Sequence, residues 1–509
     1  MAPHKVLAGA PAGVLAALTG MAAAHLVAAL IDPATSPVLS VGSQVIDLTP
    51  TPVKEWAIAQ FGTADKPILI GSVLAATLAL AGLAGMLARR RFAAGAALLA
   101  LLTALAGATA VARPGTSAGG GVLAALPALM ALVVGLLVLA WLTGALPRSQ
   151  ASTEQRRAPG RRSLLIACGL AVALAAAGER LTRVRTRIAD VVLPAAARKA
   201  PPLPAGLEEQ YAGISPFRTP TKEFYRVDTR LTLPLIDLDE WRLSIDGDVP
   251  RRVELSFDEL LALPLVERDI TMTCVSNEVG GRYVGAARWL GVPLPQLLEL
   301  AGIRSPADTG ADQILSTDVD GFTISTPLAV ALDGREPLVA VGMNGSPLPH
   351  DHGFPARLVT PGLYGFVGST KWLRRLTLTT YAAQDAYWTK RGWATDAPIK
   401  VSSRIDTPAP LAEIEAGPTV IGGVAWAQHQ GIAGVEVRID GQAWQPAELG
   451  PDAGIDYWRQ WYLPWDATPG SHLLAVRATT VDGDVQSPAR MTPFPEGATG
   501  IQEIVVRVS

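Results

Sequence analysis

The stretch TMTCVSNEVGG, residues 271–281, contains Cys274, the only cysteine outside the apolar N-terminal region. The residues before it, 268–272, predict a short strand. A polar turn with two glycines follows, so the thiol is expected where this strand opens into a loop, and functional residues often lie on such loops. A thiolate is a ligand for soft or high-valent metal centres. The alternative is an ordinary buried core cysteine, which is common.

Four motifs follow this stretch in a fixed order: ARWLGVPL at 287–294, MNGSPLP at 343–349, HGFPARLV at 352–359 and STKWL at 369–373. Together they resemble the sulfite oxidase family of molybdopterin-dependent oxidoreductases, in a membrane-anchored bacterial form. The resemblance covers roughly residues 215–509, and an ordered set is much more specific than a single motif. It implies an α+β sulfite-oxidase-like molybdopterin domain followed by an immunoglobulin-like β-sandwich.

Residues 1–180 contain five long apolar runs, and the whole chain has a mean hydropathy of +0.28. The first four are long enough to cross the ~30 Å hydrocarbon core, whereas the fifth is either a tight span or a signal-type segment. A soluble bundle would show a regular polar stripe, which these runs lack. We therefore predict an all-α transmembrane bundle, with runs at about Val6–Ile31, Ile68–Leu87, Phe92–Val111, Val122–Leu146 and Leu164–Gly178.

Basic residues predict the orientation, because cytoplasmic loops carry an excess of Lys and Arg. Two clusters indicate the inner side: Arg89, Arg90 and Arg91, and then Arg148, Arg156, Arg157, Arg161 and Arg162. This places the N-terminus inside and the catalytic half outside. A group after the fifth run disagrees: Arg180, Arg183, Arg185 and Arg187. If the fifth run did not cross, the catalytic half would be cytoplasmic. The stretch RRSLL at 161–165 also resembles an internal twin-arginine export signal, with an ordinary inner cluster as the equal alternative.

Only one histidine, His25, lies in an apolar run, so this chain alone offers no pair of membrane histidines for a haem. The membrane half is expected to be an anchor in membrane lipid or a docking surface. The electron-transfer partner, a quinone or a cytochrome, stays open. The formal net charge of −2 provides no general basic surface for nucleic acid.

The resemblance implies a molybdenum-molybdopterin cofactor, with Cys274 binding molybdenum. The protein would orient and tune the cofactor, which performs the chemistry. Asn277 is expected either to hold the loop or to point its amide at the site, and counts as a catalytic candidate. The pterin phosphate is expected at His352, Arg357, Ser369, Thr370 and Lys371, with Arg226, Asp228 and Thr229 as weaker candidates.

Two departures from the family concern the substrate. Glu278 stands where sulfite oxidases carry an arginine, and Phe322 where they carry a tyrosine. A carboxylate disfavours a dianion such as sulfite by like-charge repulsion. The resemblance therefore extends to the cofactor but not to sulfite oxidation. Candidate replacements, unranked, are Asp269, Arg282, Tyr283 and Arg288.

The C-terminal part alternates apolar and polar residues at Val435, Val437 and Ile439 and again at 504–508, with Asp440-Gly441 as a hairpin signal. Trp458, Trp461 and Trp465 are expected in the core or an interface. We thus predict a transmembrane region at 1–180, a connector at 181–215, the molybdopterin domain at 216–395 and the β-sandwich at 396–509.

The predicted function is two-electron oxygen-atom transfer on a small-molecule substrate. The sandwich resembles the family's dimerisation domain, which raises a homodimer as one alternative and leaves the oligomeric state open. The alternatives are a reductase of S- or N-oxides and a non-catalytic membrane protein with a sulfite-oxidase-like binding domain.

Overall fold

The computed structural model describes residues 9–61, 64–113, 118–145, 161–185 and 191–509. The chain divides into two compact units, Met1–Ala189 with Asp228–Ile236, and Asp190–Val227 with Asp237–Ser509. A short strip of sequence just before the mixed domain therefore belongs with the helices. Part of the orientation argument lies outside the described residues, namely Arg148, Arg156, Arg157 and Arg187.

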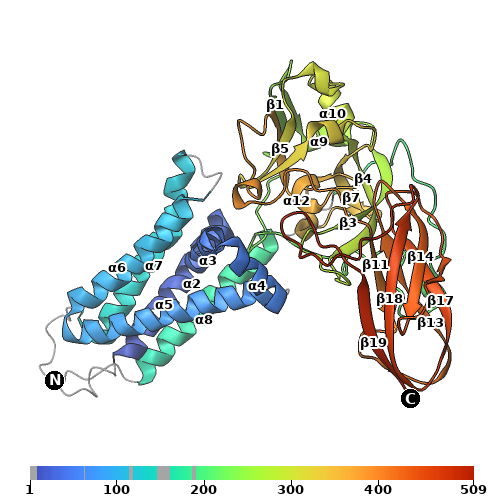
Figure 1. Ribbon diagram of the computed structural model, residues 1–509. Helices are drawn as coiled ribbons and strands as arrows, with labels where there is room; N and C mark the ends of the chain where they lie inside the picture. Colours follow the sequence, from blue (N-terminus) through green and yellow to red (C-terminus); the bar gives the residue numbers. More distant parts are fainter. Residues whose placement is uncertain (1–8, 62–63, 114–117, 146–160, 186–190) are drawn as a thin grey trace, which may run out of the picture. The chain divides into compact units, whose positions relative to one another are not determined.

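Five long helices form the first unit (Figure 1), and each is long and apolar enough to cross a membrane. Helix α2 packs against α5, α7 and α8. Its buried residues are mostly alanine and glycine. Small side chains let apolar helices approach closely, which is how such helices associate. The bounds are α2 Ala10–Ile31, α5 Asp65–Arg90, α6 Phe92–Val111, α7 Ala118–Thr143 and α8 Arg161–Arg185.

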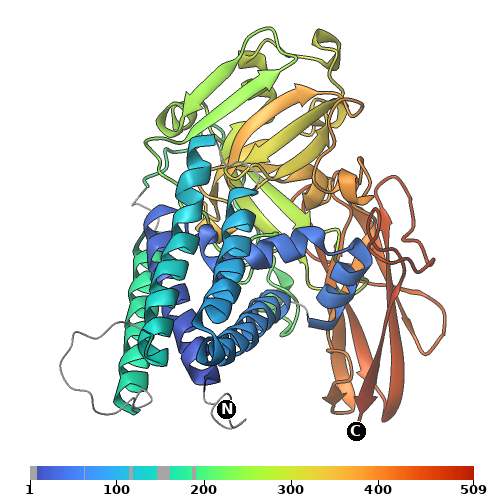
Figure 2. The same cartoon turned by 90° about the vertical axis from the view of Figure 1, so that its left-hand side faces the viewer.

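Each of the five predicted runs coincides with a helix over its described residues, apart from one or two positions at the ends, and two details differ from expectation. The fifth run is the apolar middle of α8, a 25-residue helix whose ends are basic. The segment between α2 and α5 contains two more helices, α3 (Pro37–Leu48) and α4 (Thr51–Phe61). Their mixed composition conceals them from a search for long apolar runs. Figure 2 shows the long helices lying alongside one another in a second view.

The mixed domain of the second unit is built on two sheets. One has the order β2-β1-β10-β5-β6, with β1 parallel to β10. The other has the order β3-β4-β7-β8, with β9 also paired to β7. The strands are β1 Arg242–Gly247, β2 Val253–Ser256, β3 Val266–Thr273, β4 Val284–Pro293, β5 Gln313–Asp318, β6 Thr323–Pro327, β7 Leu338–Met343, β8 Ser346–Pro347, β9 Arg357–Val359 and β10 Leu373–Thr379.

Short helices connect these strands: α9 Phe257–Leu261, α10 Leu294–Leu300, α11 Leu328–Ala331 and α12 Gly365–Gly368. The serine before α9, Ser256, accepts a hydrogen bond from the backbone N–H of Glu259, whose side chain reaches back to the Ser256 backbone. This capping box satisfies backbone donors that the helix itself leaves free.

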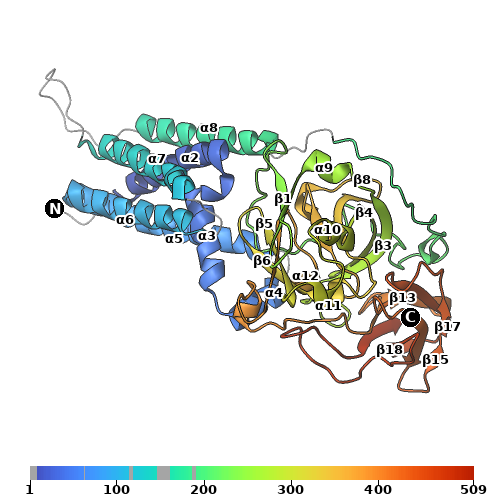
Figure 3. The same cartoon turned by 90° about the horizontal axis from the view of Figure 1, so that it is seen from above.

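The C-terminal region consists of two sheets, β11-β13-β17-β16 and β12-β19-β18-β14-β15. One hydrophobic core draws residues from both, including Trp461, Trp465 and Val506. Figure 3 shows β13 and β17 in one layer and β18 in the other. The strands are β11 Ser402–Thr407, β12 Glu413–Ile414, β13 Gly417–Trp426, β14 Ile432–Ile439, β15 Gln445–Pro446, β16 Glu448–Leu449, β17 Arg459–Ala467, β18 Gly470–Thr480 and β19 Gln502–Val508.

Sequence signals in this region agree with the structure. The Asp440-Gly441 pair follows β14, and both residues have positive φ, at 51° and 71°, as a tight hairpin turn requires. In β19 the even-numbered residues from 502 to 508 are buried and the odd-numbered ones exposed. Trp458 belongs to a second core, shared by residues of the mixed domain and the sandwich, together with Val275 and Tyr364.

Candidate functional site

Strand β3 ends immediately before Cys274, so the thiol lies at the start of the following loop. The Cys274 backbone N–H donates to the Tyr283 carbonyl at 2.9 Å, and its carbonyl accepts from the Asn277 N–H at 3.0 Å. The side chain is buried, with 8% exposed. Burial raises the pKa of the Cys274 thiol, while hydrogen bonds from Ser276 and the positive charge of Lys371 oppose that rise. Burial therefore favours the neutral thiol, and a bound cation would favour the thiolate.

The loop is held from both sides. Asn277 is buried, and its Oδ1 accepts a hydrogen bond from the Tyr283 N–H at 2.7 Å. This is the loop-holding one of the two roles expected for Asn277. From the sandwich, Arg404 Nη1 donates to the Gly281 carbonyl at 2.9 Å. The position of Cys274 thus depends on contacts within the loop and on the C-terminal region.

The three cationic or basic candidates form one buried group. His352, Arg357 and Lys371 are 3%, 5% and 8% exposed. Arg357 Nε donates to Ser369 Oγ at 2.8 Å, and its Nη1 donates to the His352 carbonyl at 3.2 Å. Lys371 Nζ donates to the Asp351 carbonyl at 3.0 Å. Lys371 also acts electrostatically on Cys274, and we therefore expect this group and the thiol to belong to one site.

His352 differs from the cation that phosphate binding would suggest. Its Nε2 lies 3.2 Å from the Thr221 carbonyl, and a carbonyl requires a donor, so Nε2 carries the proton. Burial, followed by the charge of Arg357, lowers the pKa of His352 to about 4. The neutral ring leaves Nδ1 as a buried acceptor, with no hydrogen-bond partner among the described residues. Such an atom suits an N–H group of a pterin ring better than its phosphate.

Ser369 and Thr370 are also buried. Thr370 Oγ1 lies 2.5 Å from Ser316 Oγ on β5, which orients that hydroxyl. Two buried cations, an unsatisfied acceptor and the thiol together fit an anionic cofactor that carries ring N–H groups and a metal. Buried polar atoms without partners are rare in native proteins, and a bound ligand is one explanation for them.

Sequence reasoning missed two tyrosines. The Cys274 thiol acts electrostatically on both Tyr225 and Tyr364, and Tyr225 also senses Arg357. Desolvation raises the pKa of each phenol well above its usual range, so both stay protonated at neutral pH. Tyr225 directly precedes Arg226, one of the weaker candidates that the family resemblance implies. Tyr364 follows two glycine-containing turns, and no motif pointed to it.

The weaker candidates fall in both units. Asp228 belongs to the helical unit, where its carboxylate forms an ion pair with Lys66 Nζ at 2.8 Å, and Thr229 lies in the same strip. Arg226 belongs to the second unit and is exposed.

Among the residues considered for substrate selection, Arg288 already has a charged partner within the protein. It forms an ion pair with Asp269 at 2.7 Å, and this hydrogen-bonded partner raises the pKa of Arg288. Glu278 and Arg282 are exposed. Phe322 packs against Tyr387, with ring centroids 4.7 Å apart and the ring planes inclined by 47°.

Comparison with known proteins agrees with this geometry. Residues 230–388 match the family described as oxidoreductase molybdopterin binding domain. Human mitochondrial sulfite oxidase is 31% identical over 327 residues, which cover 56% of this chain and 58% of the relative. An NADH nitrate reductase of Brassica napus is 30% identical over 196 residues, covering 34% and 21%. The chain spans little more than half the length of the mammalian sulfite oxidases that it matches.

Among solved structures, the sulfane dehydrogenase SoxCD from Paracoccus pantotrophus is similar, with a TM-score of 0.47 and 25% identity. The similarity covers 54% of this chain and 79% of that one.

Proposed function

Because the chain belongs, through residues 230–388, to the sulfite oxidase family of molybdopterin oxidoreductases, we propose that it is a membrane-anchored enzyme of two-electron oxygen-atom transfer. The observation that carries this proposal is the buried group of Cys274, His352, Arg357 and Lys371. When bound, the molybdenum-molybdopterin cofactor supplies the exchangeable oxygen and accepts or donates the two electrons.

The residues of this chain have separable tasks. Cys274 provides a thiolate ligand, and the positive charge of Lys371 favours the charged sulfur. Arg357 presents a planar guanidinium that suits a phosphate or carboxylate bound through two parallel hydrogen bonds. His352 offers Nδ1 as an acceptor. The loop contacts of Asn277 and Arg404 keep the sulfur in place while these groups hold the rest of the cofactor.

One feature favours a second candidate, the reduction of S- or N-oxides. Reduction of a sulfoxide consumes two electrons and two protons and releases water. Tyr225 and Tyr364 act electrostatically with Cys274, and desolvation raises the pKa of each phenol. Both are therefore weak acids that stay protonated and can donate hydrogen bonds to the oxygen of a neutral oxide. A neutral oxide also avoids the repulsion that the Glu278 carboxylate would exert on sulfite.

The remaining parts of the proposal concern the other regions. The five long helices would anchor the enzyme in the membrane, with the N-terminus inside and the catalytic unit outside. The two-sheet C-terminal region, residues 396–509, would be an immunoglobulin-like dimerisation domain. It follows the molybdopterin domain, residues 216–395, in the sequence. A membrane-associated carrier, a quinone or a cytochrome, would exchange electrons with the enzyme.

The proposal is tested by replacing the sulfur of Cys274 with oxygen. Cys274→Ser protein, co-expressed with cofactor biosynthesis, is expected to fold and to lose turnover at least a thousandfold in a panel of sulfite, sulfoxide and N-oxide substrates. Wild-type protein should contain about one molybdenum and one pterin per chain. Wild-type turnover in the variant, or no molybdenum in the loaded wild-type protein, would exclude the proposal. The same panel decides between oxidation of sulfite and reduction of oxides.

A further inference from the structure

An open cavity of about 580 Å³ lies between helices of the first unit, lined by α2, α5, α8, the start of α3 and the strip Asp228–Ile236. Most of its wall is leucine, alanine and valine. Ligand pockets of this kind usually have volumes of roughly 300–1,000 Å³, with an apolar wall and a few convergent polar groups. The cavity therefore has room for the headgroup of a small amphiphile and the beginning of its tail.

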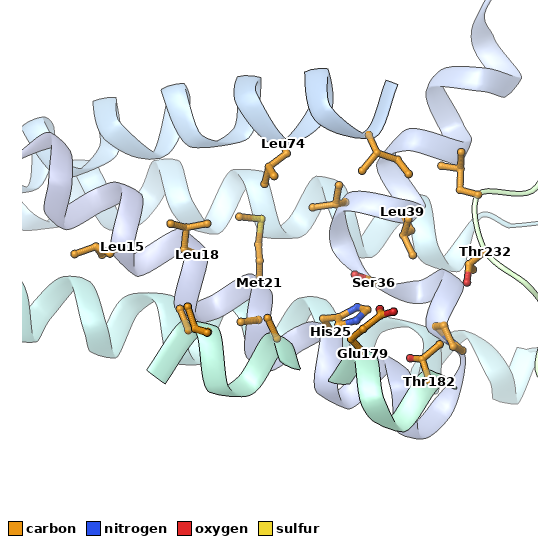
Figure 4. A pocket seen from close by; sticks show the side chains of 18 of the residues that line it. Leu15, Leu18, Met21, His25, Ser36, Leu39, Leu74, Glu179, Thr182 and Thr232 are labelled. Carbon is orange, nitrogen blue, oxygen red and sulfur yellow. The ribbon is translucent and has the colours of Figure 1, made fainter. Parts of the chain in front are cut away.

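The polar groups of this cavity gather at one end. Figure 4 shows His25 of α2 beside Glu179 of α8, with Ser36, Thr182 and Thr232 in the same part of the pocket. The opposite part is apolar, with Leu15, Leu18 and Leu74. A molecule that fits must therefore have a compact polar head and an apolar tail.

His25 and Glu179 interact electrostatically, and they form the ionisable part of this lining. Glu179 Oε1 also accepts a hydrogen bond from Arg183 Nε at 2.8 Å, which stabilises the carboxylate as an anion. The ring of His25 lies directly against Gly178, where an added Cβ would be 2.7 Å from the ring Cδ2. Ionisable groups in membrane segments are costly and usually functional.

We propose that this cavity binds a lipophilic para-quinone or its quinol, with the ring at His25 and Glu179 and the tail along Leu15, Leu18 and Leu74. An imidazole N–H can donate to a quinone carbonyl, and the imidazole nitrogen or the carboxylate can accept from a quinol hydroxyl. A phospholipid phosphate would meet both the Glu179 carboxylate and the Arg183 guanidinium that is paired with it, so added phosphatidylglycerol is the competing ligand in the test. An acyl chain alone needs neither ionisable group.

The proposal rests on the membrane placement argued above, but not on the identity of the substrate. Thr232, which lines the cavity, follows Tyr225 by seven residues in the sequence. A carrier bound here would thus be held by the same stretch of chain that leads from the proposed cofactor site.

Cys168 provides a native probe, because it is exposed and lines the cavity. The full-length protein, in lipid nanodiscs, is treated with N-ethylmaleimide with and without decylubiquinone, and alkylation of the Cys168 peptide is followed by mass spectrometry. Decylubiquinone has no free ring position, so it does not itself react with the thiol. We expect at least fivefold slower alkylation at saturation.

Variants locate the site. His25→Leu should weaken decylubiquinone binding, and the isosteric Glu179→Gln should weaken decylubiquinol binding, each about tenfold, the effect of one lost hydrogen bond to a charged or buried group. The matched control is Thr103→Val, which removes a hydroxyl that binds within its own helix and does not line the cavity. It should change binding less than twofold.

Three results would overturn the proposal: equal alkylation rates with and without decylubiquinone, equal affinity in all three variants, or equal protection by added phosphatidylglycerol. Extraction of the protein by alkaline carbonate would instead contradict the membrane placement, so the two failures are distinguishable.

Discussion

Gly280 in the cysteine loop offers a sharp test of how the sandwich supports the site. Its φ is +77°, a region that costs other residues about 1–2 kcal/mol. A Cβ at this position would lie 2.6 Å from Gln502 Nε2 and 2.9 Å from Gln502 Cδ. Gln502 cannot move away freely, because it is buried and its Oε1 accepts a hydrogen bond from the Ile405 N–H at 2.6 Å.

The control is Gly441, in the hairpin after β14. Its φ is +71°, and an added Cβ would meet no atom within 4 Å. Gly441→Ala should therefore carry only the backbone cost. Gly280→Ala carries a similar backbone cost plus the contact with Gln502, and overpacking of this kind costs about 1–3 kcal/mol. The difference between the two variants isolates the contact, and we expect it to be about 1–3 kcal/mol.

Chemical denaturation followed by tryptophan fluorescence measures this difference, and molybdenum per chain measures its effect on the site. Gly280→Ala should unfold at lower denaturant than Gly441→Ala and should bind less molybdenum, because the loop that carries Cys274 must shift. If the two variants unfold within 0.5 kcal/mol of each other and both carry wild-type metal, then the sandwich does not position the loop.

Three further predictions use the same approach. Arg357→Lys keeps the charge but loses the hydrogen bond to Ser369 and the planar fork. Cofactor retention, measured as pterin and molybdenum per chain after gel filtration, should fall about tenfold. The control Arg375→Lys changes an exposed ion pair and should retain both pterin and molybdenum. Equal loss of cofactor from Arg357→Lys and Arg375→Lys would refute the role assigned to Arg357. The pKa of His472 is raised by Asp440 and the Thr468 carbonyl, so the stability from this contact is full below pH 6.5 and is lost as the pH rises through the higher folded-state value. His472→Gln should thus be destabilised by about 1 kcal/mol at pH 6 and less at pH 9 in denaturation curves, whereas a constant difference would contradict the ion pair. A reporter enzyme that is active only outside the cytoplasm should be active when it is fused after residue 204. Activity of a cytoplasmic reporter at the same position would instead place the catalytic unit inside the cell.

Much of this architecture is visible in the sequence because the signals are local. Long apolar runs predict the helices, alternating residues predict β14 and β19, and Ser256 with Glu259 predicts the start of α9. The buried group of His352, Arg357 and Lys371 was expected from motif order. That Lys371 acts on Cys274 becomes visible only in the fold, because β3 and the chain after β9 are far apart in sequence.

Other features depend on contacts that no local pattern encodes. Tyr364 is a site residue because the fold brings it near Cys274, from a turn with no distinctive neighbours. The tautomer of His352 follows from one carbonyl, that of Thr221. Asp228 was a weaker cofactor candidate on the family resemblance alone, and the structure pairs its carboxylate with Lys66 in the helical unit.

The strip Asp228–Ile236 has a practical consequence for producing the enzyme without its anchor. Leu231 lies close to Gly42 of α3, and Pro234 is buried. A fragment that begins after α8 would retain this leucine-rich piece but not the helices that shield it from water. Such a truncated enzyme should self-associate through the uncovered leucines, and replacing Leu231 and Leu233 by serine should restore a monodisperse, secretable product.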